Sequence, residues 1–221
     1  MKKKEGLWLA IDGIDAVGKS TQVPRVAGDL RDRNVQPVVE LKEFSNAPVG
    51  QTILRILNEK RFYALNDEKT SPLADTLHLL SDMVYNYETA IYPAVQNGGV
   101  AVTDRGASSF VGYQAVRVGE RSPQFGERKA ISWAQSITRH CLVIPDLTVL
   151  IRISHDEMMR RVVQRGEEPL SANELEFLDK VDRTMVKTIK GLSKEHIIID
   201  GQQPIEEITT QIADYVMQRL R

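Results

Sequence analysis

The chain has 221 residues, and its 29 basic and 30 acidic side chains leave a formal net charge of −1. This balance provides no basic field for nucleic acid, and no stretch approaches the roughly 20 apolar residues that a membrane helix needs. A single cysteine, Cys141, rules out an intrachain disulfide. We therefore expect a protein of a reducing, cytoplasmic compartment without nucleic-acid or membrane partners.

Five short apolar segments alternate with stretches of helical character. The apolar segments predict strands that are buried on both faces, at residues 7–11, 36–41, 99–103, 147–151 and 197–199. The clearest helical stretch is residues 73–95, where apolar side chains recur three and four residues apart. The alternation predicts one α/β domain over residues 1–221, a three-layer fold with a five-stranded parallel sheet and helices on both faces. Ligands bind such sheets at the carboxyl ends of the strands.

The first predicted strand runs into a glycine-rich segment that matches the phosphate-loop pattern G-x-x-x-x-G-K-[ST] in full. Glycine permits backbone angles that let the loop N–H groups point at phosphate oxygens, with a helix N-terminus behind them. The lysine would reach the β- and γ-phosphates, and the serine would ligate Mg²⁺. The sequence therefore predicts a P-loop NTPase fold whose nucleotide-binding residues are Gly13, Ile14, Asp15, Ala16, Val17, Gly18, Lys19, Ser20 and Thr21.

The third predicted strand ends in Asp104 and Arg105. An aspartate at the end of an apolar strand is where phosphate-loop enzymes place a second carboxylate that organises the metal ion. The arginine can hold phosphate oxygens in its planar fork of donors but cannot act as a base toward water. The pair therefore favours binding of a second phosphorylated molecule over hydrolysis of the first. A surface ion pair at the strand end is the alternative interpretation.

The helical stretch after the fourth strand carries Arg160, Arg161 and Arg165, followed by a loop-forming sequence at residues 166–169. Arg161 and Arg165 are four residues apart and would share one helix face. Two arginines beside a triphosphate can neutralise the charge that develops during phosphoryl transfer. We expect a short lid over residues 160–172, with these two arginines as catalytic groups. A solvated helix surface is the alternative.

Several segments, taken in order and spacing, resemble the thymidylate kinase family of nucleoside monophosphate kinases. The resemblance covers nearly the whole chain. Each segment alone is a weak signal, whereas the set is specific. The segments are Asp12-Gly13-Ile14-Asp15 through Gly18-Lys19-Ser20-Thr21-Gln22, Tyr92-Pro93-Ala94-Val95 with Asn97-Gly98-Gly99, Asp104-Arg105 with Ser109 and Gly112-Tyr113-Gln114, Pro145-Asp146-Leu147-Thr148 through Arg165-Gly166, Phe177-Leu178-Asp179-Lys180-Val181, and Ile199-Asp200-Gly201.

The resemblance implies a kinase that uses ATP and Mg²⁺ and forms a homodimer. It also implies roles for single residues toward a small nucleotide acceptor. Asp15 would bond the acceptor's sugar hydroxyl, and Arg105 would clamp its phosphate. Lys42 stands where the family has arginine and would contact the phosphate as a point charge. Ser109 and Gln114 would face the base, while Ser20 and Asp104 would organise the metal ion.

The sequence departs from the family around the acceptor and in the phosphate loop. Ala16 stands where some members carry a catalytic arginine, which points to Arg161 and Arg165 instead. Leu79 and Met83 replace the phenylalanine and arginine with which the family stacks on thymine and reads it. Both would be acceptor-binding residues, and an apolar pocket of this kind would discriminate only weakly between bases. Core packing of these two side chains is the alternative. Gly106 replaces the usual aromatic residue.

The leading hypothesis is phosphorylation of a nucleoside monophosphate by ATP, with thymidine monophosphate (dTMP) as acceptor and the diphosphate dTDP as product. A second hypothesis is a kinase of the same fold acting on another nucleotide or on a nucleoside, which Leu79 and Met83 favour. A third is a nucleotide-binding regulator with little turnover, because residues 167–172 contain no arginine.

Overall fold

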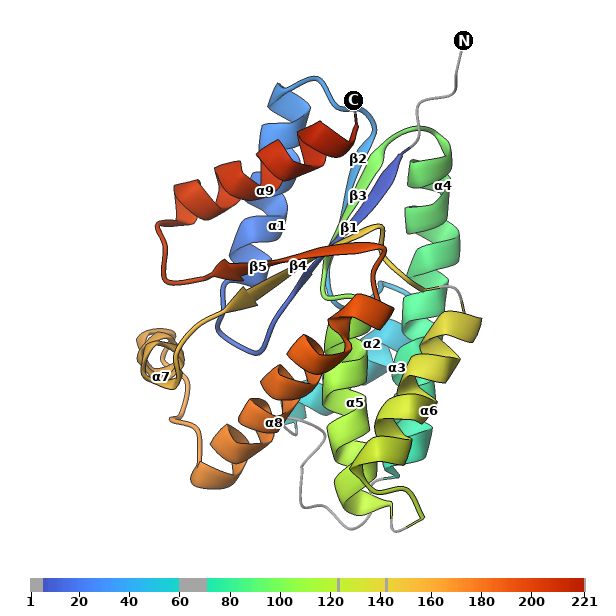
Figure 1. The fold of residues 1–221 in the computed structure, drawn as a ribbon, viewed down its shortest axis with the longest axis vertical. Helices are drawn as coiled ribbons and strands as arrows, with labels where there is room; N and C mark the ends of the chain where they lie inside the picture. The colour runs from blue at the N-terminus through green and yellow to red at the C-terminus, as the bar shows by residue number, and fades with distance from the viewer. Residues whose placement is uncertain (1–5, 60–70, 123, 142, 221) are drawn as a thin grey trace.

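The computed structural model describes residues 6–59, 71–122, 124–141 and 143–220. The predicted strands form one five-stranded parallel sheet in the order β2-β3-β1-β4-β5 (Figure 1). Sequence ranges and observed strands agree to within a few residues, the largest difference being in the last strand. The strands are β1 (Leu7–Asp12), β2 (Val38–Leu41), β3 (Val100–Asp104), β4 (Leu147–Arg152) and β5 (Glu195–Asp200).

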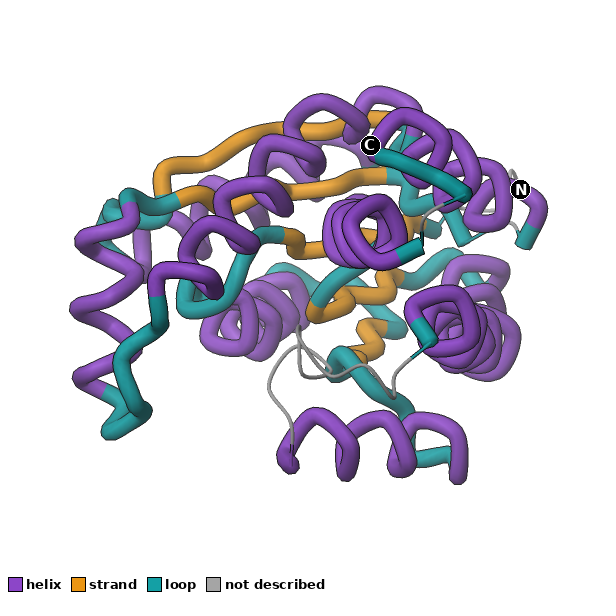
Figure 2. Tube along the Cα trace, turned by 90° about the horizontal axis from the view of Figure 1, so that it is seen from below, coloured by secondary structure: helices purple, strands orange, loops and turns teal. Residues whose placement is uncertain are grey.

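Helices cover both faces of the sheet, which confirms the predicted three layers (Figures 1 and 2). On one face α1 (Lys19–Asp32) packs beside α9 (Ile205–Arg219). On the other face α5 (Ala107–Arg121) lies between α6 (Glu127–His140), α8 (Ala172–Thr188) and α3 (Pro72–Asn86), with α2 (Pro48–Glu59) against α3. The helix α7 (His155–Gln164) follows β4, and residues 165–171 join it to α8.

The central strand β1 explains why the predicted strands are continuously apolar. Its side chains alternate between two buried clusters: Leu9 and Ile11 pack with residues of α1 and α9, whereas Trp8 packs with residues of α3, α5 and α6. Both faces of the sheet are therefore removed from water, so no polar alternation appears in the sequence. The Trp8 indole N–H donates to Thr103 Oγ1 at 3.1 Å, which satisfies the polar tip of this side chain.

The predicted helix over residues 73–95 is present but is not α-helical throughout. After α3 the chain continues as a π-helix over Tyr87–Ile91 and then as α4 (Tyr92–Gln96). Pro93 lies at the start of α4 and has no N–H for the carbonyl four residues earlier. The wider π turn lies where that hydrogen bond is missing. Periodicity alone could not predict it.

The strand register sets the position of the site. Ile11 pairs with Asp104, and Asp12 pairs with Leu150, so the carboxyl ends of β3, β1 and β4 lie side by side. The segment that follows β1 and the segment that follows β3 therefore start next to each other. This arrangement brings together two motifs that are about ninety residues apart in sequence.

Candidate active site

The phosphate loop joins β1 to α1 and has the backbone that its sequence predicts. Gly13 and Gly18 have φ values of +145° and +103°, which L side chains rarely adopt. A Cβ atom at Gly13 would also lie 2.4 Å from the Ile151 carbonyl oxygen, so the loop approaches the end of β4 closely. Gly18 caps α1 at its N-terminus, and the first turn of that helix holds Lys19 and Ser20.

Lys19 is held inside the loop. Its ammonium group donates to the Ile14 carbonyl at 2.9 Å, and the residue is only 6% exposed. Burial lowers the pKa of Lys19, and the neighbouring Arg105 charge lowers it further, while Asp104 and Asp15 act in the opposite direction. The ammonium group thus lies against the Ile14 carbonyl in the phosphate loop, where the oxygens of a triphosphate would be its partners.

Ser20 and Asp104 meet across the strand ends, as the metal hypothesis requires. The Ser20 hydroxyl donates to Asp104 Oδ2 at 2.6 Å. Asp104 Oδ1 is buried and has no hydrogen-bond partner among the described residues. A hydroxyl beside a carboxylate oxygen with free lone pairs is the donor set that Mg²⁺ takes in phosphate-loop proteins, with phosphate oxygens and water completing the shell. The residues present therefore fit this ion.

Arg105 lies at the centre of a charged cluster between the two motifs. Its backbone is left-handed, with φ of +73°, which turns the side chain back toward the phosphate loop. The guanidinium group donates to the Gly13 carbonyl at 2.9 Å and pairs with Asp15 at 2.5 Å and Glu43 at 2.7 Å. Burial disfavours its charge, but Glu43 and Asp15 more than compensate and hold the pKa of Arg105 well above its ordinary value.

Tyr113, which the sequence places in a family-like segment without a predicted role, is also a member of this cluster. Its hydroxyl lies 3.3 Å from Asp15 Oδ1, and its ring lies under the Arg105 guanidinium at 4.8 Å. The signal that could have found it is helical spacing, because Tyr113 follows Ser109 by four residues on α5 and so shares its face. The ring and the carboxylate together fix the arginine in one orientation.

A cavity of about 270 Å³ opens beside this cluster, between α3, α5 and the segment after β2. Six of the predicted acceptor residues line it, so Leu79 and Met83 are not only core residues. Phe44, Phe110 and Leu57 add apolar surface that was not predicted. The predicted residues in the lining are Asp15, Leu79, Met83, Arg105, Ser109 and Gln114.

Lys42 does not have the expected place. It is exposed and is not among the residues that line the cavity. The next residue, Glu43, reaches the site and binds Arg105 instead. Both residues follow the end of β2 at Leu41, and the chain there turns so that Glu43 and not Lys42 meets Arg105. The expectation that Lys42 contacts the acceptor phosphate is therefore not supported by this geometry.

Gly106 stands where the family usually has an aromatic residue, and the structure leaves no space for a side chain there. A Cβ atom there would lie 2.6 Å from the Ala10 Cβ atom and 3.2 Å from Pro145 Cγ. The Gly106 N–H donates to Asp12 Oδ1 at 2.7 Å, which ties the turn after β3 to the end of β1. In this chain the backbone itself occupies the space beside β1, so no side chain fits.

The lid arginines have different surroundings. Arg161 donates to the carbonyls of Ala16 and Val17 at 3.2 and 3.1 Å and to the Gly201 carbonyl at 2.7 Å. Arg165, directly after α7, is half exposed and lies 4.0 Å from Glu167. The structure thus brings Arg161 onto the phosphate loop and leaves Arg165 at the surface.

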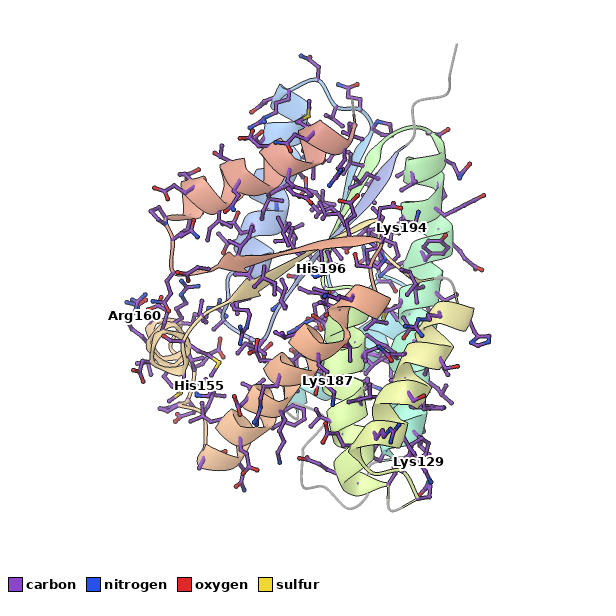
Figure 3. All side chains as sticks on the ribbon, viewed as in Figure 1. Lys129, His155, Arg160, Lys187, Lys194 and His196 are labelled. Atoms are coloured by element: carbon purple, nitrogen blue, oxygen red, sulfur yellow. The ribbon has the colours of Figure 1, made fainter. Side chains whose placement is uncertain are left out.

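Arg160 is not part of the site. It lies on the outer side of α7, where it forms an ion pair with Glu157 at 2.6 Å (Figure 3). Arg160 therefore lies on a solvated helix surface, which was the alternative interpretation of these arginines.

Within residues 6–59, 71–122, 124–141 and 143–220, no helix is both long and apolar enough to cross a membrane. The same residues contain no group of three or more His, Cys, Asp and Glu side chains that could hold a metal ion on their own. A metal ion at Ser20 and Asp104 would therefore depend on oxygens of a bound nucleotide and on water.

A phosphate loop, a serine–aspartate pair that fits a metal ion and a cavity beside Arg105 are the features of a phosphate-loop nucleotide kinase. Residues 11–212 match the family model described as thymidylate kinase, and the chain belongs to that family of phosphotransferases. It is 27% identical over 216 residues to the thymidylate kinase of Thermoanaerobacter sp. (strain X514), covering 98% of this chain and 100% of the relative. The thymidylate kinase of Hahella chejuensis is 26% identical (98% and 99% covered), and the probable thymidylate kinase of Methanosarcina barkeri 24% (97% and 98%).

Asp12, at the end of β1, should make stability depend on pH. It is fully buried, and its Oδ2 atom has no hydrogen-bond partner within the described ranges. Burial raises the pKa of Asp12 above its ordinary value of 3.8. An acid whose pKa is raised by folding binds its proton more tightly in the native state. The free energy of unfolding therefore falls as the pH rises from the ordinary pKa through the raised one.

The variant Asp12→Asn keeps the acceptor for Gly106 and removes the buried charge. We expect it to increase the free energy of unfolding at pH 7 by on the order of 1 kcal/mol and to flatten the pH dependence above pH 4. Urea unfolding between pH 4 and pH 8 measures both effects, with the exposed Asp32→Asn variant as control. A less stable variant at pH 7 with an unchanged pH slope contradicts the expectation.

Proposed function

We propose that the protein transfers the γ-phosphoryl group of ATP to dTMP and so produces dTDP and ADP. An oxygen of the acceptor phosphate attacks the γ-phosphorus, and the bond from that phosphorus to the bridging oxygen of ADP breaks. One observation carries the proposal. The Ser20–Asp104 pair and the Arg105 cluster converge at the ends of β1 and β3, between the phosphate loop and the cavity.

The donor side needs positioning and charge neutralisation more than covalent chemistry. The N–H groups of the loop and the N-terminus of α1 would hold the phosphates, and Lys19 would exchange the Ile14 carbonyl for phosphate oxygens. Ser20 and Asp104 would hold Mg²⁺, which supplies charge neutralisation at the β- and γ-phosphates when bound. Family membership supports ATP as donor.

The charged cluster around Arg105 would bind the acceptor nucleotide. Arg105 would donate to the acceptor phosphate, since its guanidinium lies between the loop and the cavity. Asp15 would accept from the sugar hydroxyl, with Tyr113 holding the carboxylate in place. The base would lie against the apolar side chains of Leu79 and Met83, which can offer contact area but no hydrogen-bond donor.

The choice of acceptor is tested by a panel of nucleoside monophosphates and nucleosides with ATP and Mg²⁺. We expect dTMP to have the highest kcat/KM, in line with family membership. A rank for dTMP near the bottom would support the second candidate, a kinase for another acceptor, which the apolar pair Leu79 and Met83 favours. Nucleotide binding without transfer to any acceptor would support a regulator instead.

Substitution of Arg105 should impair the reaction with dTMP far more than the binding of ATP. For Arg105→Met we expect kcat/KM for dTMP to fall about 30-fold or more, because charge-assisted hydrogen bonds to the acceptor phosphate are lost. The KM for ATP should change much less, since Lys19 and the loop remain. Steady-state kinetics with each substrate varied in turn measures both, and Arg31→Met at the surface is the matched control. An equal loss toward both substrates contradicts this role.

The two lid arginines should respond differently to substitution. We propose that Arg161 braces the phosphate loop through its backbone carbonyls, whereas Arg165 reaches the transferring group when residues 160–172 close over ATP. Arg165→Met should then lower kcat with little change in the free energy of unfolding, and Arg161→Met should raise the KM for ATP and lower stability by about 1 kcal/mol. Kinetics and urea unfolding separate them, and a reversed pattern would exchange the two roles.

We also propose a homodimer in the cytoplasm, as family resemblance implies. Three large side chains along the helical segment from α3 to α4 remain exposed in one copy of the chain, and they would be available to a second copy. They are Leu77, Tyr85 and Tyr92, at 53%, 44% and 49%.

A further inference from the structure

Glu157 lies in the first turn of α7, and its carboxylate joins two neighbouring arginines of that helix. Arg160 donates to both carboxylate oxygens at 2.7 and 2.6 Å, and Arg161 Nε donates to Oε1 at 2.6 Å. The hydrogen bonds from Arg160 and Arg161 lower the pKa of Glu157 from its ordinary value of 4.5 to about 2, so the group is ionised at neutral pH. Arg160 points outward from α7, whereas Arg161 reaches the phosphate loop (Figure 3).

The Arg161 guanidinium group uses all three of its nitrogens. Nε bonds Glu157, Nη1 donates to the carbonyls of Ala16 and Val17, and Nη2 donates to the Gly201 carbonyl. Of these partners, Glu157 alone carries a charge. The Arg161 side chain is 22% exposed, so its charge is partly withdrawn from water and the carboxylate compensates it. Glu157 therefore holds the guanidinium group from one side, while the backbone carbonyls occupy the other.

The carbonyl contacts of Arg161 set the direction of two N–H groups in the phosphate loop. A peptide unit is planar and trans, so its C=O and N–H groups point to opposite sides. Because the carbonyls of Ala16 and Val17 are turned toward Arg161, the N–H groups of Val17 and Gly18 are turned away from it. The N–H groups of such a loop are the donors that bind phosphate oxygens.

Ala16 is the residue of the loop at which this support matters most. Its φ of +63° is left-handed, a conformation that a Cβ atom disfavours and that glycine adopts without cost. The hydrogen bond from Arg161 to the Ala16 carbonyl stabilises the chain in this conformation. Without it, the peptide unit between Ala16 and Val17 would be freer to turn, and its N–H group would lose its direction.

We propose that Glu157 is a positioning residue for the triphosphate: it holds Arg161 on the loop carbonyls and so keeps the N–H groups of Val17 and Gly18 directed at phosphate oxygens. The inference rests on the proposed function, because it adds a residue to the donor side of the same reaction. An acidic residue in a first turn also stabilises its helix through the helix dipole. That role alone would change the stability of the protein and leave the affinity for ATP as it is.

The first test is titration calorimetry of ATP and Mg²⁺ in the absence of an acceptor. We expect Glu157→Ala to raise the Kd for ATP about tenfold, the worth of one charge-assisted hydrogen bond acting through Arg161. Glu157→Gln keeps an oxygen acceptor for Arg161 Nε and should raise the Kd about threefold or less. The binding stoichiometry reports the folded fraction separately, so a partial loss of folded protein does not alter the Kd.

Two other residues of α7 provide matched controls. Asp156→Asn removes an exposed negative charge from the same first turn and tests the helix dipole, while Arg160→Met removes the outer partner of Glu157. We expect both variants to keep the Kd for ATP within about twofold of wild type, as for exposed charges. In an Arg161→Met background, Glu157→Ala should cause no further loss of affinity, because Glu157 acts through Arg161.

The outcomes separate this inference from the proposed function. An unchanged Kd in Glu157→Ala overturns the inference, as does an equal loss in Asp156→Asn or a tenfold loss that persists in the Arg161→Met background. All three leave the kinase assignment standing. Absence of phosphoryl transfer to every monophosphate overturns the proposed function, and the titrations still decide the role of Glu157 because they measure ATP binding without transfer.

Discussion

The parallel pairing of β1 with β3 is the constraint on which the site depends. It sets Ile11 beside Asp104, so that the phosphate loop and the turn after β3 begin at the same edge of the sheet. Two contacts between them follow from this register: Ser20 with Asp104, and Arg105 with the Gly13 carbonyl. A slip of one residue would point Asp104 to the opposite face of the sheet and would remove both.

Charge compensation fixes what the register brings together. Arg105 is largely withdrawn from water, and its charge is balanced by Asp15 and Glu43, from the loops after β1 and β2. These contacts hold the Arg105 side chain in place at the cavity, where we propose that the acceptor binds. Preorganised groups of this kind lose little entropy on binding, which is how such a site can accelerate phosphoryl transfer without a covalent bond to the protein.

Much of the fold and of the donor side was predictable because the signals are local. Continuous apolar runs gave the five strands, and the spacing of Gly13, Gly18 and Lys19 gave the phosphate loop. The acceptor side was only partly predictable. Lys42 and Glu43 are neighbours in sequence, yet only Glu43 reaches the cavity, and Tyr113 lay in a family-like segment without a predicted role. The side of a strand end that faces a cavity depends on how the next segment packs, and no local pattern records it.

By itself, the sequence determined the layers of this protein, its triphosphate loop and its family resemblance, since each rests on residue types at short, regular spacing. The tertiary structure alone decided which partners surround each arginine. Arg105, Arg117, Arg161 and Arg165 have the same side chain, but Arg105 lies against two carboxylates, Arg117 donates to Gln114, Arg161 donates to loop carbonyls and Arg165 is half exposed. A guanidinium group acts through the partners around it, and those partners come from distant segments that only folding brings together.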